Sequence, residues 1–248
     1  MTFFNIIIPL YNAEQWLARC LKTARAQNYD NYRVIIINDC STDNSKSVIE
    51  NQIEGNEKFT LISTPQNGGS LSSIKFGIDF ADPHDEDVIV LLDGDDWLAR
   101  PDVLTILNNV YNNNDCLMTY GSYAEYPANI KGKFSRQLPK NIIKEKLFRE
   151  HIWVTSHLKT FKYKLWKNIK QEDMLDNNGR IYAMAGDLCL MFPMLEMAEE
   201  RSLFIEDILY VRNGANAINE HYVNRDLQED LERIIRKKSV YPRLEEIQ

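Results

Sequence analysis

The sequence contains few cysteines and lacks the spacing that cysteine-based sites require. Its 248 residues include Cys20, Cys40, Cys116 and Cys189, which lie far apart without a Cys-x-x-Cys pair. A cysteine-ligated metal site and a dithiol redox motif are therefore disfavoured. The four residues lie in apolar surroundings or at the ends of expected elements, so we expect free thiols of a reducing compartment.

Long hydrophobic runs are also missing. The amino terminus, Met-Thr-Phe-Phe-Asn-Ile-Ile-Ile-Pro, has no basic residue before its apolar run, which is only as long as a strand. It therefore fits neither a signal peptide nor a membrane-spanning helix. We expect a cytoplasmic protein without a transmembrane segment, in which membrane contact through a partner or an acceptor stays open.

Basic residues are the minority among the charges. Lysine and arginine number 29 against 36 acidic residues, for a formal net charge of −7. This balance does not favour nucleic-acid binding, and an anionic small molecule would need local cations or a metal ion. Internal repeats, low-complexity tracts and linkers are absent from the sequence, so we expect one domain over residues 1–248 and leave a homo-oligomer open.

The first half of the chain alternates apolar runs with amphipathic stretches. We expect strands at 4–8, 32–37, 59–63 and 88–92, and helices at 13–27, 45–52 and 70–80. Nearly continuous isoleucine and valine runs of strand length predict a mostly parallel sheet buried on both faces. The expected fold class is α/β, with a Rossmann-like sheet, helices on both faces and a smaller, irregular second half.

The second half is less regular. We expect helices at 101–112, 164–168, 187–198 and 223–238, and strands at 116–120, 152–160 and within 203–211. Residues 125–139, rich in tyrosine, proline, glycine and lysine, are expected to form a loop. That loop is either an acceptor surface or a mobile lid.

Three carboxylates follow the fourth expected strand. Asp93, Asp95 and Asp96 come directly after Val-Ile-Val-Leu-Leu. Acidic groups crowded at the carboxyl end of a buried strand repel one another unless a divalent cation compensates them. Ligands of open α/β sheets bind at the same edge, which favours a metal site there. The simpler alternative is a solvated acidic turn in which Asp96 caps the next helix.

The other strands also end in residues suited to a ligand. Asp39 can accept a hydrogen bond from a ring or ribose donor. Pro9 and Tyr11 form a rigid turn with an aromatic face that could stack on a base, although a buried structural tyrosine fits equally well. Asn67-Gly68-Gly69 lets the backbone approach a ligand, and the following helix amino terminus favours an anion.

The motifs together are more specific than any one of them. Four segments, Ile-Ile-Ile-Pro-Leu-Tyr-Asn at 6–12, Ile-Ile-Asn-Asp-Cys-Ser-Thr-Asp-Asn-Ser at 36–45, Asn-Gly-Gly at 67–69 and Leu-Leu-Asp-Gly-Asp-Asp-Trp at 91–97, follow a known order and spacing. The chain resembles the family 2 glycosyltransferases of GT-A fold. The resemblance implies inverting, metal-dependent transfer of a hexose from a nucleotide-diphosphate sugar, with UDP favoured, to a hydroxyl of a glycan, polysaccharide or protein.

The resemblance also implies roles for the residues of the first half. Pro9 and Tyr11 would lie along the base, and Asp39 would hydrogen-bond the uracil edge. Asp95 would be the direct ligand of Mn²⁺ or Mg²⁺, with Asp93 serving the ribose or the metal. Residues 1–112 would bind the nucleotide sugar, 113–222 would bind the acceptor and catalyse transfer, and 223–248 would form a helical tail.

An inverting transfer needs a base for the acceptor hydroxyl, and the family places it at the start of a helix in the second half. Asp187, in Ala-Gly-Asp-Leu-Cys-Leu, fits that pattern, although it could simply be the helix N-cap. Lys159 or Arg212 could meet phosphate, and His221 could complete the metal shell or contact the diphosphate. Each of these could equally be an ordinary surface or packing residue.

The chain departs from the family pattern at two places. Asn38 and Cys40 stand where an additional aspartate and a glycine are common. After the paired glycines the family often has Ala-Arg-Asn, whereas this chain has Ser-Ile-Lys at 73–75. Lys75 could compensate with its charge in the donor site, or lie on the helix surface.

Two other functions remain. Nucleotidyl transfer also uses acidic residues and Mg²⁺, but such enzymes usually open with a glycine-rich, basic loop, which residues 8–12 lack. A non-catalytic nucleotide-sugar or glycan-binding module of the same fold is the alternative outside catalysis.

Overall fold

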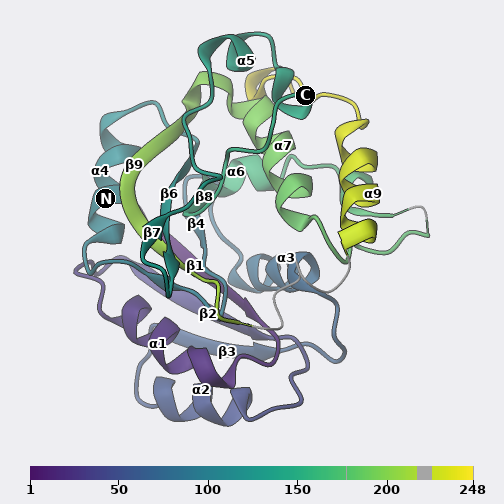
Figure 1. The fold of residues 1–248 in the computed structure, drawn as a ribbon. Coiled ribbons are helices and arrows are strands. Elements are labelled where there is room, and N and C mark those ends of the chain that lie inside the picture. The colour runs from purple at the N-terminus through teal and green to yellow at the C-terminus, as the bar shows by residue number, and fades with distance from the viewer. Residues whose placement is uncertain (177, 217–224, 248) are drawn as a thin grey trace.

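Parallel strands of the first half and mixed strands of the second half form one sheet (Figure 1). The computed structural model describes residues 1–176, 178–216 and 225–247. Within these residues the strand order is β3-β2-β1-β4-β8-β6-β9-β5, and β7 pairs with β6. The strands are β1 (Phe4–Leu10), β2 (Tyr32–Asn38), β3 (Phe59–Ser63), β4 (Val88–Leu91), β5 (Trp97–Leu98), β6 (Met118–Tyr126), β7 (Ile130–Lys131), β8 (Lys159–Lys162) and β9 (Ser202–Asn213).

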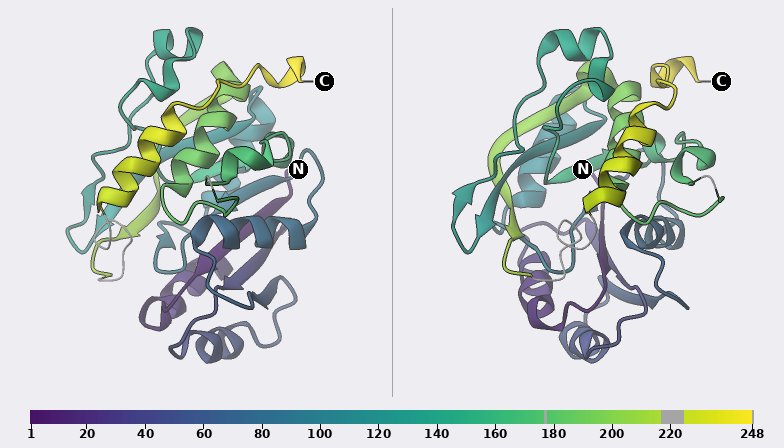
Figure 2. Two further views of the ribbon diagram at one scale, coloured as in Figure 1. Left: turned by 90° about the vertical axis from the view of Figure 1, so that its right-hand side faces the viewer. Right: turned by 45° about the vertical axis from the view of Figure 1, so that its right-hand side comes forward.

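Helices cover both faces of this sheet, as the views in Figures 1 and 2 show. They are α1 (Glu14–Arg25), α2 (Ser45–Ile53), α3 (Ser70–Ala81), α4 (Val103–Asn113), α5 (Lys140–Lys144), α6 (Tyr163–Trp166), α7 (Gly186–Ala198) and α9 (Arg225–Arg236), with 3₁₀ turns at Leu147–Arg149, Gln171–Met174, Glu199–Arg201 and Leu244–Glu246. The expected α/β class and the largely parallel first half of the sheet are confirmed.

The apolar runs become strands because each strand is buried on both faces. Along β1 every residue is buried, and successive side chains point to opposite faces. Ile7 packs in a core with Ile74 of α3 and with α7, whereas Ile6 and Ile8 pack in a second core with α1 and α4. Two cores of this kind hold the carboxyl ends of β1, β2 and β4 at one rim.

Strand expectations in the second half need correction. The expected strand at 152–160 is wrong: β8 covers only Lys159–Lys162, which lies between β4 and β6 in the sheet. The apolar residues before it pack instead, since the Trp153 ring meets Phe192 of α7 at 5.6 Å. The expected strand at 116–120 runs on to Tyr126, and the expected loop at 125–139 contains β7.

The strand β9 is a single twelve-residue element rather than one or two short strands. Its pairing with β6 shifts register around Gly121 and Ser122, so the strand bends and stays paired over its length. Helix α4 begins at Val103 rather than Pro101. All four cysteines are free thiols, as expected. No helix in the described ranges is long and apolar enough to cross a membrane.

Candidate active site

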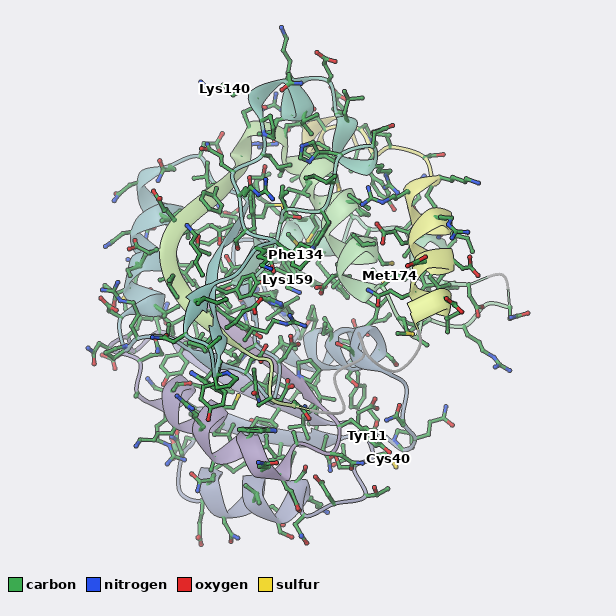
Figure 3. All side chains as sticks on the ribbon, in the orientation of Figure 1. Tyr11, Cys40, Phe134, Lys140, Lys159 and Met174 are labelled. Atoms are coloured by element: carbon green, nitrogen blue, oxygen red, sulfur yellow. The ribbon has the colours of Figure 1, made fainter. Side chains whose placement is uncertain are left out.

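A cleft of about 620 Å³ opens at the rim where β1, β2 and β4 end. Figure 3 labels Tyr11 and Cys40 beside this rim, and Lys159 nearer the centre of the molecule. The cleft brings together most of the residues expected from the sequence: Pro9, Tyr11, Asp39, Asn67, Gly68, Asp93, Asp95, Asp187 and Arg212 all line it.

The glycine between Asp93 and Asp95 fixes the position of the acidic turn. Its amide donates to the Pro9 carbonyl at 3.1 Å, which ties the turn to the end of β1. A β-carbon at Gly94 would lie 2.5 Å from the β-carbon of Leu10. Only glycine permits this close approach. The approach places the carboxylates of Asp93 and Asp95 beside the end of β1.

Asp96 anchors β9 and does not cap a helix, so the capping alternative is wrong. Its carboxylate accepts hydrogen bonds from the Tyr210 hydroxyl at 2.6 Å and from the Asn213 amide at 2.6 Å. Helix α4 has Asp102 as its N-cap. Burial, followed by the charges of Asp95 and Asp93, raises the pKa of Asp96 well above its ordinary value.

Asp93 and Asp95 face the cleft in a strongly acidic setting. Burial raises the pKa of Asp93 to about 6. Among the neighbouring charges, Lys159 opposes this shift in the pKa of Asp93, while Asp187 and Asp95 add to it. The Asp95 carboxylate accepts a hydrogen bond from the Asn216 side chain at 2.8 Å. A cation among these oxygens would relieve the repulsion that the folded chain imposes.

The carboxylates Asp93 and Asp95 fit a shared divalent cation better than a fully enclosed one. No three histidine, cysteine, aspartate or glutamate side chains of the described residues form a metal-holding group. Mg²⁺ is commonly bound through one or two carboxylates, substrate phosphates and water, and hard oxygen donors also suit Mn²⁺. His221, expected as a further ligand, lies outside the described residues.

Asp39 is buried and holds the glycine turn. Its carboxylate accepts hydrogen bonds from the Thr64 hydroxyl at 2.7 Å, from the Gly68 amide at 3.1 Å and from the Gly69 amide at 2.8 Å. Both carboxylate oxygens are thus engaged with the loop itself. The residue lines the cleft as expected, but its contacts make it the organiser of the Asn67-Gly68-Gly69 turn.

Asp187 lies in the first turn of α7, with Ala185 as the N-cap. The N-cap alternative for Asp187 is therefore wrong. Its carboxylate forms an ion pair with Lys159 of β8, whose side chain is buried. Lys159 thus supports a cleft carboxylate from behind, a contact that sequence reasoning did not anticipate.

Of the cations expected at the donor site, Arg212 lies in the cleft and Lys75 does not. Arg212, at the end of β9, lines the cleft. Lys75 pairs with Asp79 one helical turn away on α3 and is not among the described residues that line the cleft. The helix-surface alternative for Lys75 therefore describes its position.

Several cleft residues escaped sequence reasoning because they come from distant segments. His157 stacks on Tyr210, with ring centroids 4.5 Å apart, and lines the cleft. Residues 182–186, which lead into the start of α7, form another wall, and Gln228 of α9 reaches the same space. Only the short Gly-Asp signal at 186–187 pointed to this part of the cleft.

A profile described as Glycosyl transferase family 2 matches residues 5–174. The chain belongs to glycosyl transferase family 2. The resemblance expected from the sequence is therefore confirmed. The match includes the rim loops and the acidic turn but ends before α7.

Curated relatives match the first part of this family member. An uncharacterised glycosyltransferase of Haemophilus influenzae is 36% identical over 124 residues, which are 50% of this chain and 48% of that protein. Glycosyltransferase GlyG of Streptococcus pneumoniae is 24% identical over 122 residues, 49% of this chain and 39% of its own length. The chain thus spans less than half of either relative.

Solved structures share the fold over nearly the whole chain. S. aureus TarS 1-349 in complex with UDP-GlcNAc aligns with a TM-score of 0.68 at 15% identity, covering 94% of this chain and 65% of that one. The mannosyltransferase PcManGT from Pyrobaculum calidifontis, in complex with GDP-Man and Mn²⁺, aligns with a TM-score of 0.63 at 16% identity, covering 96% and 65%.

Proposed function

We propose that this glycosyltransferase moves a hexose from a UDP-sugar to a hydroxyl acceptor with inversion, using a divalent cation and Asp187 as the base. The observation that carries the proposal is that aspartates from both halves of the chain line one cleft. Asp93 and Asp95 follow β4, while Asp187 begins α7 on another wall. The metal-binding carboxylates for the donor and the base for the acceptor would thus lie in the same cleft.

On the donor side, Asp95 with Asp93 would hold Mn²⁺ or Mg²⁺. Such an ion neutralises the charge that develops on a diphosphate leaving group. Tyr11, with 41% of its surface exposed at the rim, offers a ring for the base. The Asn67-Gly68-Gly69 turn, braced by Asp39, would shape the pocket around that base. Arg212 supplies a cation in the same cleft.

On the acceptor side, Asp187 presents a carboxylate that is 48% exposed while Lys159 holds it from within. The acceptor hydroxyl would give its proton to this carboxylate as its oxygen attacks the anomeric carbon. The acceptor would be a glycan, a polysaccharide or a protein hydroxyl, approaching along the wall formed by residues 182–186.

UDP is favoured by the sequence pattern. Of the two solved structures, TarS is in complex with UDP-GlcNAc and PcManGT with GDP-Man. A thermal-shift screen of UDP- and GDP-sugars with Mn²⁺ tests the choice of UDP. We expect stabilisation by a UDP-sugar and a smaller or absent shift with GDP-sugars. A larger shift with GDP-sugars would contradict the UDP assignment while leaving sugar transfer intact.

Asp187→Asn tests the base. We expect unchanged donor binding and a loss of transfer of at least about 100-fold, the usual contribution of a general base. Asp226→Asn is the matched control, because Asp226 is also acidic in the first turn of a helix, α9. Full turnover by Asp187→Asn would remove Asp187 as the base.

Product analysis separates the competing functions. Release of UDP from a UDP-sugar supports glycosyl transfer, whereas release of pyrophosphate would indicate nucleotidyl transfer. Slow hydrolysis of the donor without acceptor argues against a non-catalytic binding module. If the donor bound but was not cleaved, whichever acceptor was added, the non-catalytic binding module would be favoured.

A further inference from the structure

Residues 127–144, which follow β6, form a basic segment in an acidic protein. The segment contains five cations and no acidic residue, although the formal charge of the chain is −7. The cations are all exposed: Lys131, Lys133, Arg136, Lys140 and Lys144. Among the residues that the structure describes, none of these five cations has a carboxylate within ion-pair distance, and the first paired cation after them is Lys146.

Several neighbouring cations of the second half, in contrast, form ion pairs with carboxylates. Just beyond the segment, Lys146 pairs with Glu199 at 2.7 Å and Arg149 pairs with the buried Glu196. Lysines on β8 and α6 pair with Glu86, and Lys167, directly after α6, pairs with Asp85. The basic segment is therefore a local concentration of uncompensated positive charge.

Regularly spaced anchors hold the first part of this segment against β6. Gly132 donates to the Tyr123 carbonyl at 2.9 Å, Ser135 donates to the Gly121 carbonyl, and Leu138 donates to the Tyr120 hydroxyl at 3.0 Å. All three anchors are buried. A β-carbon at Gly132 would overlap the Tyr123 ring, so only glycine permits this approach.

The residues between the anchors face outward. Ile130 and Phe134 are 50% and 56% exposed, and they lie between the cations along the chain. Both views of Figure 2 show the segment running along the outside of the molecule from β7 to α5, and Figure 3 labels Phe134 and Lys140 on it. Fixed backbone, unpaired cations and exposed apolar side chains thus occur on one surface.

We propose that residues 130–144 dock the chain on an anionic lipid surface. Lysine and arginine would meet headgroup phosphates, while Ile130 and Phe134 would enter the interface between headgroups and acyl chains. A soluble polyanion would use the same cations but would gain little from two exposed apolar side chains. The apolar pair is what favours a membrane as the partner.

The pairing of the strands relates this surface to the cleft. Ile130 pairs with Glu125 of β6, and Glu125 pairs with Arg212 of β9, which lines the cleft. Two strand spacings, roughly 10 Å, therefore separate the start of the docking surface from a cleft residue. Docking goes beyond the proposed sugar transfer and would bring the cleft close to a membrane.

Vesicle co-sedimentation tests the proposal and requires no turnover, so its failure would leave the proposed transferase function untouched. We expect binding to phosphatidylcholine vesicles that contain phosphatidylglycerol, little binding to phosphatidylcholine alone, and weaker binding as salt increases. The double variant Lys133→Glu/Arg136→Glu should bind at least about tenfold more weakly. Lys140→Glu/Lys144→Glu, on α5, should independently weaken binding to the same vesicles.

Matched variants on other faces serve as controls. Lys22→Glu/Lys46→Glu makes the same charge change on α1 and α2 and should bind vesicles like the parent protein. Phe134→Ser should weaken vesicle binding, whereas Phe80→Ser, on exposed α3 surface, should not. Equal binding to both vesicle types would overturn the proposal. The proposal would also be overturned if Lys22→Glu/Lys46→Glu weakened vesicle binding as much as Lys133→Glu/Arg136→Glu. Binding of inorganic polyphosphate without binding of anionic vesicles would overturn it as well.

Discussion

The buried ammonium of Lys159 forms an ion pair with the carboxylate of Asp187 and so joins β8 to the first turn of α7. The Lys159 side chain is 4% exposed and that of Asp187 is 48% exposed. The pair therefore has an inner cationic end and an outer acidic end that faces the cleft. We infer that Lys159 positions the proposed base rather than contacting the substrate.

Replacing Lys159 should separate positioning from binding. Lys159→Met should lower kcat for transfer by about ten- to a hundredfold, because the carboxylate loses its fixed orientation. Affinity for UDP with Mn²⁺ should stay within about twofold, since a positioning role leaves the donor site intact. Lys159→Arg should recover part of the loss, and Lys162→Met, on the same strand and paired with Glu86, is the control. Loss of UDP affinity in Lys159→Met alone would instead give Lys159 a direct role with the donor.

Asp93 should make the metal-free protein less stable at neutral pH. Its folded pKa of about 6 lies above the ordinary aspartate value of 3.8. The folded state therefore binds more protons than the unfolded state between these values, and stability falls as pH rises through that window. Asp93→Asn should raise the Tm at pH 7 by a few degrees, at about 2–4 °C per kcal/mol in a chain of this size.

The same variant should bind the metal poorly, so Mn²⁺ with UDP should stabilise the parent protein more than Asp93→Asn. At pH 4 the two proteins should differ little in Tm, because the parent carboxyl is then largely protonated in the folded state. Thermal melts across this pH range provide the measurement. A lower Tm for Asp93→Asn at pH 7 in chelator would contradict the proposed electrostatic cost.

Tyr210 connects the acidic turn to β9, and its removal should be costly. Its hydroxyl donates to Asp96 at 2.6 Å, and the Asp93 amide donates to the same hydroxyl at 3.3 Å. Tyr210→Phe leaves a buried carboxylate with one donor fewer, which should cost about 1.5–3 kcal/mol of unfolding free energy. Urea denaturation measures this cost. Tyr32→Phe, which removes a 3.2 Å bond to the Ala24 carbonyl away from the cleft, should cost less.

The first half of the fold was predictable because its signals are local. Continuous apolar runs mark strands that are buried on both faces, and polar residues after each run mark the rim where they converge. Cys40 shows the limit of such signals: its φ of +57° explains why glycine is common there, but the sequence alone did not reveal the backbone angle. These rules led to Asp39, Asp93 and Asp95 in the cleft, but not to Leu71 and Ile74 of α3, which also line it.

The second half was less predictable because its contacts are not local. Tyr210 reaches the acidic turn across more than a hundred residues, and Lys159 reaches Asp187 from another strand. The run Ile-Trp-Val at 152–154 has strand-like composition, but it forms no strand, and the Trp153 ring packs on Phe192 of α7 instead. Contacts between segments far apart in the sequence, which no single segment reveals, decide the structure of this region.

The buried ion pair of Arg149 and Glu196 supports the wall of the cleft formed by α9. Arg149 also donates to the Ile235 carbonyl at 2.7 Å, and the Tyr241 amide donates to Glu196 at 3.0 Å. Arg149→Met would leave the Glu196 carboxylate buried without its cation, so we expect a loss of about 3–5 kcal/mol in unfolding free energy. Arg243→Met, which removes exposed ion pairs with Glu200 and Glu245, should cost at most about 1 kcal/mol.

The double variant Arg149→Met/Glu196→Leu distinguishes charge burial from general loss of packing. Removing both charges eliminates the unpaired carboxylate, so the double variant should be more stable than Arg149→Met. Glu196 lies in α7 and Ile235 in α9, whose Gln228 lines the cleft, so donor affinity should follow the same order as stability. Urea denaturation and UDP titration measure the two effects. If the double variant were no more stable than Arg149→Met, the cost would lie in lost packing and backbone hydrogen bonds rather than in the uncompensated charge.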